Sequence, residues 1–149
     1  VTGLGMNTQE MQANPRLGAN QVQDINACPE LPFASNSFDA VVCSLSVEYM
    51  TQPEQVMQEI QRVLRPGGVV LFSFSNRWFP PKVTRLWTEI HEFERLGLVV
   101  ELVFGNGGFH QLETVTARNW WRPTDDKWYG HLWTSDPVFV LGAYVTKEG

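Results

Sequence analysis

Residues 37–45, with the sequence SFDAVVCSL, decide the fold class of this chain. A polar turn leads into a short apolar run that shows no alternation between apolar and polar residues. This pattern is typical of a strand that is buried on both faces of a parallel sheet. We therefore expect a central strand at residues 40–45.

The residues that follow predict a helix and then a second strand. Val56, Met57, Ile60, Val63 and Leu64 recur at the 3.6-residue period of a helix. The sequence Pro-Gly-Gly at 66–68 ends this helix, because proline cannot continue its hydrogen bonds and glycine tolerates the left-handed conformation. A buried strand is expected at 69–74. Strand, helix and strand in this order indicate an α/β fold with a parallel sheet.

The flanking sequence extends the alternation in both directions within one domain, residues 1–149. On the amino-terminal side we expect strands at 1–5 and 21–23 and a helix at 8–13. On the other side we expect a helix at 82–96 that ends at Gly97, a strand at 98–104, a turn at 105–108 and a last strand at 138–145. The aromatic-rich stretch 119–133 is expected to pack over the edge of the sheet.

The composition of the chain limits the kinds of binding partner that we expect. The net charge is −5 and the basic residues are scattered, so nucleic acid is not expected. No apolar run approaches the roughly 20 residues of a membrane-spanning helix, so no membrane partner is expected. Cys28 and Cys43 have neither the spacing nor the neighbouring histidines of a metal site. Reduced thiols and a cytoplasmic location follow as expectations.

Four segments taken together resemble the class I S-adenosylmethionine-dependent methyltransferases that act on small molecules. They are Asp24, residues 31–33 (LPF), residues 37–42 (SFDAVV) and residues 62–68 (RVLRPGG). Their order and spacing match over roughly residues 1–75. The resemblance implies a doubly wound, mostly parallel sheet, with S-adenosylmethionine bound across the carboxyl ends of the strands.

The resemblance also assigns cofactor-binding residues. Asp24 matches the acid that accepts a hydrogen bond from the adenine amino group, and Ile25 and Met6 match the residues that pack on the two faces of the ring. Ser44 and Leu45 match the segment beside the methionine part of the cofactor. Gly5 stands where the family usually has an acid on the ribose hydroxyls, so that contact is missing or comes from another side chain.

Glu48, Tyr49 and Arg77 are the candidates for facing a small-molecule acceptor. No catalytic residue and no metal site is predicted, because direct displacement on a sulfonium needs positioning more than a dedicated base. Asp39 and the three histidines are expected to have structural or surface roles. For Asp24 the competing interpretation is a side chain that forms the turn before Asn26.

The sequence lacks the first strand of such a domain and the glycine-rich turn and first helix that follow it. By resemblance this strand lies between the strands at 1–5 and 40–45. Three outcomes are open: these two strands pair directly, the free edge pairs with another molecule, or an upstream segment belongs there. We expect a homo-oligomer formed through the open edge. The rival to a methyltransferase is a non-catalytic fragment or oligomeric binding module with an incomplete cofactor cleft.

Overall fold

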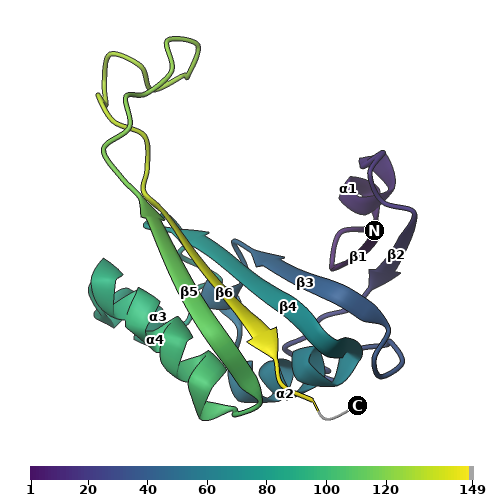
Figure 1. Cartoon of the computed structure of the whole chain (residues 1–149). Coiled ribbons are helices and arrows are strands. Elements are labelled where there is room, and N and C mark those ends of the chain that lie inside the picture. The colour runs from purple at the N-terminus through teal and green to yellow at the C-terminus, as the bar shows by residue number, and fades with distance from the viewer. Residues whose placement is uncertain (148–149) are drawn as a thin grey trace.

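A computed structural model describes residues 1–147 (Figure 1). The elements are β1 (Thr2–Gly5), α1 (Thr8–Ala13), β2 (Ala19–Val22), β3 (Phe38–Ser44), the 3₁₀ turn η1 (Val47–Tyr49), α2 (Pro53–Val63), β4 (Leu64–Ser75), α3 (Arg85–Glu89), α4 (Glu92–Gly105), β5 (Phe109–Ala117) and β6 (Val138–Val145).

The strands form two sheets instead of one. The larger sheet has the order β3-β4-β6-β5, in which β3 and β4 are parallel and β6 is antiparallel to both of its neighbours. The smaller sheet contains only β1 and β2, which are parallel. The α/β class is therefore confirmed, and the antiparallel pairs come from the last strand.

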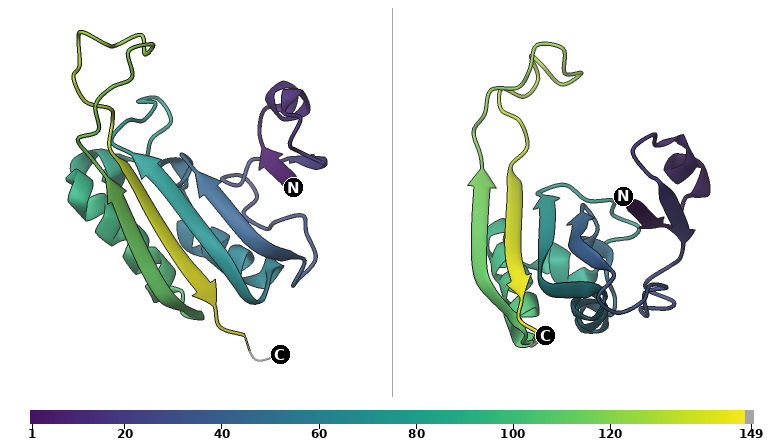
Figure 2. Two further views of the ribbon diagram at one scale, coloured as in Figure 1. Left: turned by 45° about the horizontal axis from the view of Figure 1, so that its top comes forward. Right: turned by 45° about the vertical axis from the view of Figure 1, so that its right-hand side comes forward.

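The core lies between one face of the larger sheet and the helices α2, α3 and α4, which Figure 2 shows on the same side of that sheet. Phe72 and Leu141 are fully buried on the sheet, and Met57, Trp87 and Val99 meet them from the helices. Phe74 stacks on Phe139 and meets the Trp87 ring edge-on. Burial of these large side chains is the main source of stability for the larger sheet.

The opposite face of the larger sheet carries no helix within the described residues. Val42 is 66% exposed and Val115 is 62% exposed, although both are β-branched residues that favour buried strands. We expected a strand at 40–45 that is buried on both faces. That prediction was wrong for β3, because no helix of residues 1–147 covers the face of the sheet that carries Val42.

The unit formed by β1, α1 and β2 contains the two strands and the helix that were expected in residues 1–23. Asn7 caps α1 by accepting hydrogen bonds from the backbone N–H groups of Gln9 and Glu10 at 3.1 and 3.2 Å. The helix that was expected to stop at residues 66–68 is present as α2 but ends earlier, at Val63, and the strand expected at 69–74 lies within β4, which begins at Leu64. Gly67 has a φ of 71°, which explains the glycine at that turn.

The segment 82–105 corrects two predictions. The chain is helical at α3, breaks at Ile90, and is helical again through the whole of α4, so the strand expected at 98–104 is absent. His91 and Glu94 form a reciprocal cap that begins α4. Arg95, Val99 and Val103 are buried at a spacing of four, which is the helical period. A short apolar run cannot be distinguished from a buried helical turn by its pattern alone.

The strand that replaces the expected one is β5, which was not predicted. Its exposed polar residues, such as His110, Glu113 and Thr116, hid it in the sequence. Residues 118–137 connect β5 to β6 and extend away from the sheet as an arm (Figure 1).

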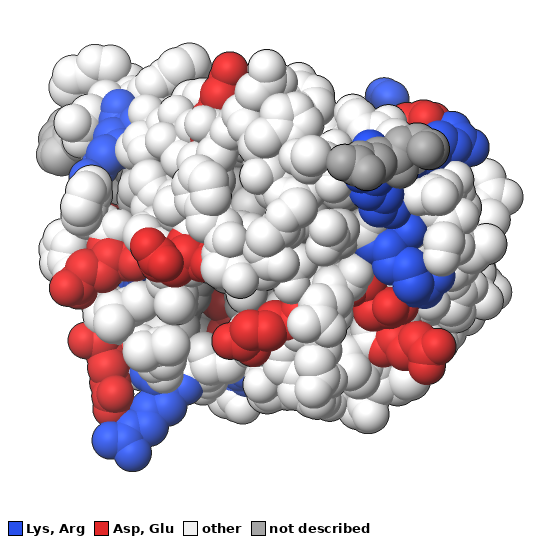
Figure 3. Space-filling view, turned by 60° about the horizontal axis from the view of Figure 1, so that its bottom comes forward, with Lys and Arg blue, Asp and Glu red and all other residues white. Residues whose placement is uncertain are grey.

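The charged side chains form small groups. Figure 3 shows most of the Lys and Arg side chains on the visible face close to Asp or Glu, and no broad basic surface appears there. Two ion pairs of the chain are Arg65–Asp39 and Arg62–Glu59. Among residues 1–147, no helix combines the length and the apolar composition that crossing a bilayer requires.

Candidate functional site

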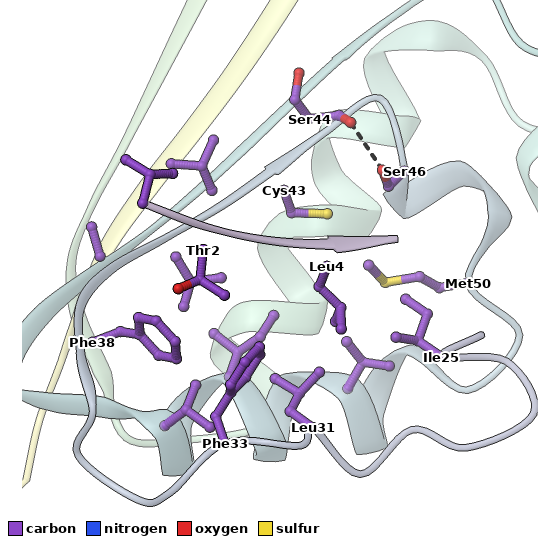
Figure 4. A pocket seen from close by; sticks show the side chains of 17 residues that line it. Thr2, Leu4, Ile25, Leu31, Phe33, Phe38, Cys43, Ser44, Ser46 and Met50 are labelled. Atoms are coloured by element: carbon purple, nitrogen blue, oxygen red, sulfur yellow. Dashed lines mark hydrogen bonds between the residues drawn. The ribbon is translucent and has the colours of Figure 1, made fainter. Parts of the chain in front are cut away.

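The site begins with a slot between β1 and β3. Its volume is about 580 Å³, in the range of small-molecule pockets. Figure 4 shows Thr2 and Leu4 of β1 on one side and Cys43 and Ser44 of β3 on the other. The floor is apolar and consists of Leu31, Phe33, Phe38, Val56, Ile60 and Val63.

The slot exists because its two walls do not pair with each other. β1 pairs only with β2, and β3 pairs only with β4. Of the three outcomes considered from the sequence, direct pairing of these two strands is therefore excluded. Each wall presents a free strand edge to the slot, and such an edge carries backbone donors and acceptors without strand partners.

Arg62 holds the floor in place. Its guanidinium donates to the carbonyl oxygens of Leu31 and Phe33 at 2.9 and 2.8 Å, and it forms an ion pair with Glu59 at 2.7 Å. Glu59 in turn accepts from the backbone N–H of Leu31. The hydrogen bonds from Arg62 hold the pKa of the Glu59 carboxyl below its usual value. The loop that follows β2 is thus fixed against α2.

The polar groups of the slot gather at the carboxyl end of β3. Ser44 accepts a hydrogen bond from the Ser73 hydroxyl at 2.8 Å, and the Ser46 hydroxyl donates to the carbonyl of Ser44 at 2.9 Å. Ile25, which follows β2, lines the same slot and lies beside Leu4 and Met50 in Figure 4. The predicted residues Ile25 and Ser44 therefore come from two separate sheets and line one slot.

The other predicted cofactor residues lie outside the lining. Met6 is 70% exposed just beyond β1, and Leu45 is 56% exposed with a φ of 51°, a left-handed conformation that is unusual for leucine. Gly5 ends β1, and a side chain there would meet the sulfur of Met11 only at an ordinary distance of 3.6 Å. No close approach therefore requires glycine at this position.

Asp24 has the structural role that the sequence offered as its alternative. One carboxylate oxygen accepts from the backbone N–H of Asn26 at 2.9 Å, and its carbonyl accepts from Ala27 and Cys28. This arrangement is an Asx turn. Its other carboxylate oxygen, Oδ2, has no hydrogen bond among the described residues.

Glu48 is buried and does not face the slot. Its side chain is 1% exposed, and Oε2 has no hydrogen-bond partner among the described residues. Burial raises the pKa of this carboxyl above its ordinary value. Burial and then the nearby Glu48 charge also raise the pKa of the Cys43 thiol to about 12, so that thiol is unreactive at neutral pH.

Tyr49 and Arg77 make contacts around the segment that follows β4. The Tyr49 hydroxyl accepts from the backbone N–H of Phe79 at 3.0 Å. Arg77 forms an ion pair with Asp136 at 2.7 Å, so its guanidinium already has an acidic partner.

Ser46 and Met50 line the slot but were not predicted from the sequence. Ser46 reaches the slot through the turn at Leu45, whose left-handed conformation no sequence pattern indicated. Met50 gave no signal either, since it reaches the slot only through the 3₁₀ turn. In the described part of the chain, no three His, Cys, Asp or Glu side chains form a metal-binding group.

Comparison with known proteins agrees with this arrangement. Residues 1–72 match the profile of the family described as methyltransferase domain. A ubiquinone/menaquinone biosynthesis C-methyltransferase of Hahella chejuensis is 33% identical over 101 residues, which are 68% of this chain and 35% of that protein. A mitochondrial 2-methoxy-6-polyprenyl-1,4-benzoquinol methylase of Mus musculus is 29% identical over 98 residues, 66% of this chain and 30% of that protein. The matches thus span about a third of these relatives.

Solved structures share the fold over nearly the whole chain. A SAM-dependent methyltransferase of Methanosarcina mazei has a TM-score of 0.60 at 16% identity, covering 99% of this chain and 82% of that one. A second, from Mesorhizobium loti, has a TM-score of 0.59 at 18% identity, covering 97% and 79%.

The fold and the converging strand ends define a Rossmann-like α/β domain. Residues 1–72 match the methyltransferase-domain family, and the chain shares its fold with solved S-adenosylmethionine-dependent methyltransferases. This match implies S-adenosylmethionine as the cofactor.

The predicted side chains in and beside the slot suit one half of that cofactor. Ile25 in the lining offers an apolar surface to a ring, and Asp24 and Met6, which lie outside the lining, add a carboxylate acceptor and a second apolar surface that suit an adenosine. Among the described lining residues there is no charged side chain for the ammonium and carboxylate of the methionine half. The fit is therefore to the adenosine portion.

Proposed function

We propose that the protein containing this domain transfers a methyl group from S-adenosylmethionine to a small-molecule acceptor. The observation that carries the proposal is that one slot runs along β1 and β3 and that three segments, Leu4 of β1, Ile25 after β2 and Ser44 of β3, line its part at the carboxyl ends of these strands. Open α/β sheets bind ligands at this edge. The family match over residues 1–72 covers all three segments.

The residues of this chain would act by binding and positioning. When bound, S-adenosylmethionine supplies a methyl group on a positively charged sulfur, which an acceptor atom can displace directly. Asp24 would accept from the adenine amino group through Oδ2, Ile25 and Met6 would pack on the ring, and Ser44 and Leu45 would lie along the cofactor's methionine side. Holding donor and acceptor in line while water is excluded can supply much of the rate enhancement.

The acceptor class is suggested by the relatives. Several have names that specify quinol or quinone ring substrates, in one case a polyprenyl benzoquinol. We propose an aromatic ring of this kind with an apolar tail as the acceptor. Tyr49 and Arg77 stay as predicted acceptor-side residues, and Arg77 would have to exchange its Asp136 contact to bind an acidic group. Glu48 is not proposed for this role, because its carboxyl is buried.

The test is calorimetric titration with S-adenosylhomocysteine. The chain should bind, and the Asp24→Ala variant should bind at least about tenfold more weakly, since it loses a charge-assisted hydrogen bond. The Asp39→Ala variant is the matched control, because it removes an exposed carboxylate that pairs with Arg65 away from the slot. Equal affinity of the Asp24 variant and the parent would overturn the assignment of the adenine site.

We also propose that the free edge of β3 leads to self-association. An unpaired strand edge beside an apolar slot is a template for pairing with another chain. A cytoplasmic location is proposed as well, and the two free cysteines support it, because unpaired thiols persist in a reducing compartment.

A further inference from the structure

The arm formed by residues 118–137 buries one arginine and exposes most of its aromatic side chains. At its centre is Arg122, whose side chain is only 4% exposed. The guanidinium donates to Asp126 at 3.0 Å and to the carbonyl of Thr134 at 2.9 Å, and it lies 3.5 Å from Asp136. Asp136 also pairs with Arg77, which ties the base of the arm to the end of β4.

Backbone hydrogen bonds give the arm a defined shape. Arg122 donates to the carbonyl of Trp133 at 3.0 Å, and Ser135 donates to the carbonyl of Trp120 at 2.8 Å, so the two sides of the arm are paired. The tip turns through residues 123–132, where the Asp126 side chain accepts from the backbone N–H of Trp128 at 2.7 Å. The aromatic residues are therefore displayed on an ordered support.

These aromatic residues point into solvent. Trp120 is 72% exposed, Trp121 is 78% exposed and Trp133 is 67% exposed, whereas Trp87 in the core is 2% exposed. Around the tip, Trp128, Tyr129 and Leu132 are also exposed, at 42%, 48% and 44%. Large exposed apolar side chains gathered within one short segment indicate an interaction site.

The chemistry of the arm favours a lipid surface. Tryptophan and tyrosine carry a large apolar ring with a polar edge, which suits the boundary between lipid headgroups and acyl chains. Residues 118–137 contain three basic and three acidic side chains, so the arm has no net charge while the whole chain has −5. The arm therefore offers no charge pattern for a strongly charged partner, and a bilayer would not repel it.

The position of the arm links it to the slot. β5 is antiparallel to β6, and β6 is antiparallel to β4, so the carboxyl end of β5 lies at the same end of the sheet as the carboxyl ends of β3 and β4. The arm leaves the sheet at this end, as Figure 2 shows. A surface contacted by the arm would therefore face the end of the slot that carries its polar groups.

We propose that the arm docks at the headgroup level of a lipid bilayer and thereby brings the site to an acceptor dissolved in the membrane. The choice of this partner rests on the proposed function, in which the acceptor has an apolar tail. The proposal departs from the expectation that no membrane partner exists. Peripheral docking can be achieved by exposed aromatic side chains and does not need a membrane-spanning helix.

The experiment measures vesicle binding without cofactor or acceptor. The chain is mixed with phosphatidylcholine vesicles, and the bound fraction is measured by flotation. We expect binding that changes little with added salt, because no net charge is involved. The triple variant Trp120→Ser, Trp121→Ser, Trp133→Ser should partition at least about tenfold more weakly, since binding scales with buried apolar area.

A matched control removes exposed aromatic residues elsewhere. Phe93→Ser with Phe104→Ser alters the outer surface of α4, where these rings are 75% and 55% exposed, and should bind vesicles like the parent. Quenching of the parent's tryptophan fluorescence by brominated lipid gives a second readout that needs no variant. Absence of both flotation and quenching, or equal loss in the α4 control, would overturn the proposal.

Self-association through the arm without vesicle binding would also overturn the proposal, because the occupant would then be a second copy. The test is independent of the proposed function. A chain that binds vesicles but not S-adenosylhomocysteine would retain the docking role and lose the methyltransferase assignment, and the opposite result would do the reverse.

Discussion

β3 and β4 are neighbouring parallel strands with similar apolar composition, but they have different environments. β4 is paired on both edges, and Val70, Phe72 and Phe74 are at most 1% exposed on its helix-covered face. β3 is paired on one edge and borders the slot on the other, and it leaves Val42 66% exposed on the face that no described helix covers. The difference shows that burial of a strand depends on what lies beside it and over it, and that its own residues do not guarantee that burial.

The largest effect is expected at β4, the strand that is paired on both edges and covered by helices. Phe72→Ala should lower the free energy of unfolding by about 3–5 kcal/mol, because it removes a fully buried ring and leaves a cavity. Val42→Ala on β3 should change it by about 0.5 kcal/mol or less, as is usual for exposed positions. Urea unfolding of both variants measures the contrast. Similar losses at the two positions would mean that β3 is covered in solution.

The next effect concerns the free edge of β3. Light scattering at increasing protein concentration should show a mean mass rising to at least twice that of one chain. Val42→Lys should suppress this association, because a charged side chain beside an edge opposes pairing. Val115→Lys is the matched control on β5, the other edge strand, where the residue is similarly exposed. A chain that stays monomeric at every concentration would contradict the proposed association.

The smallest expected effect concerns Glu48, whose carboxyl is buried in the turn that follows β3. Burial raises the pKa of Glu48 in the folded chain above its ordinary value of 4.5. The folded state thus binds more protons than the unfolded state above that value, so the stability contribution is complete below about pH 4.5 and is lost as the pH rises through the folded-state pKa.

Glu48→Gln removes this titration. At pH 8 the variant should be more stable than the parent by on the order of 1 kcal/mol, and the advantage should disappear near pH 4. Urea unfolding as a function of pH measures the difference. Parallel pH dependences for the two proteins would show that Glu48 finds a polar partner in solution.

Local sequence was a good guide where one element determines its own boundaries. Asn7 before α1, the 3.6-residue spacing in α2, Gly67 after it and the apolar run of β6 were all found at the expected places. Sequence failed at 98–104, where seven mostly apolar residues suit a strand or a buried helix equally. The cap formed by His91 and Glu94 and the packing of Val99 against the sheet selected the helix.

The sequence predicted part of the site correctly and could not predict several of its contacts. The resemblance pointed to Ile25 and Ser44, and both line the slot. It could not show that Asp24 uses one oxygen to form a turn, that Arg77 is paired with Asp136, or that Glu48 is buried. Each of these depends on groups that are distant in sequence or on the path of the following turn.

The sequence alone determined the α/β class, the family and the order of most elements, because these follow from periodicity, turn residues and motifs that act over a few residues. Only the tertiary structure decided that β1 and β3 stand apart with a slot between them, that one face of the larger sheet is bare, and that the arm buries Arg122 and exposes its tryptophans. Pairing and burial are properties of neighbours in space, and a local pattern does not specify those neighbours.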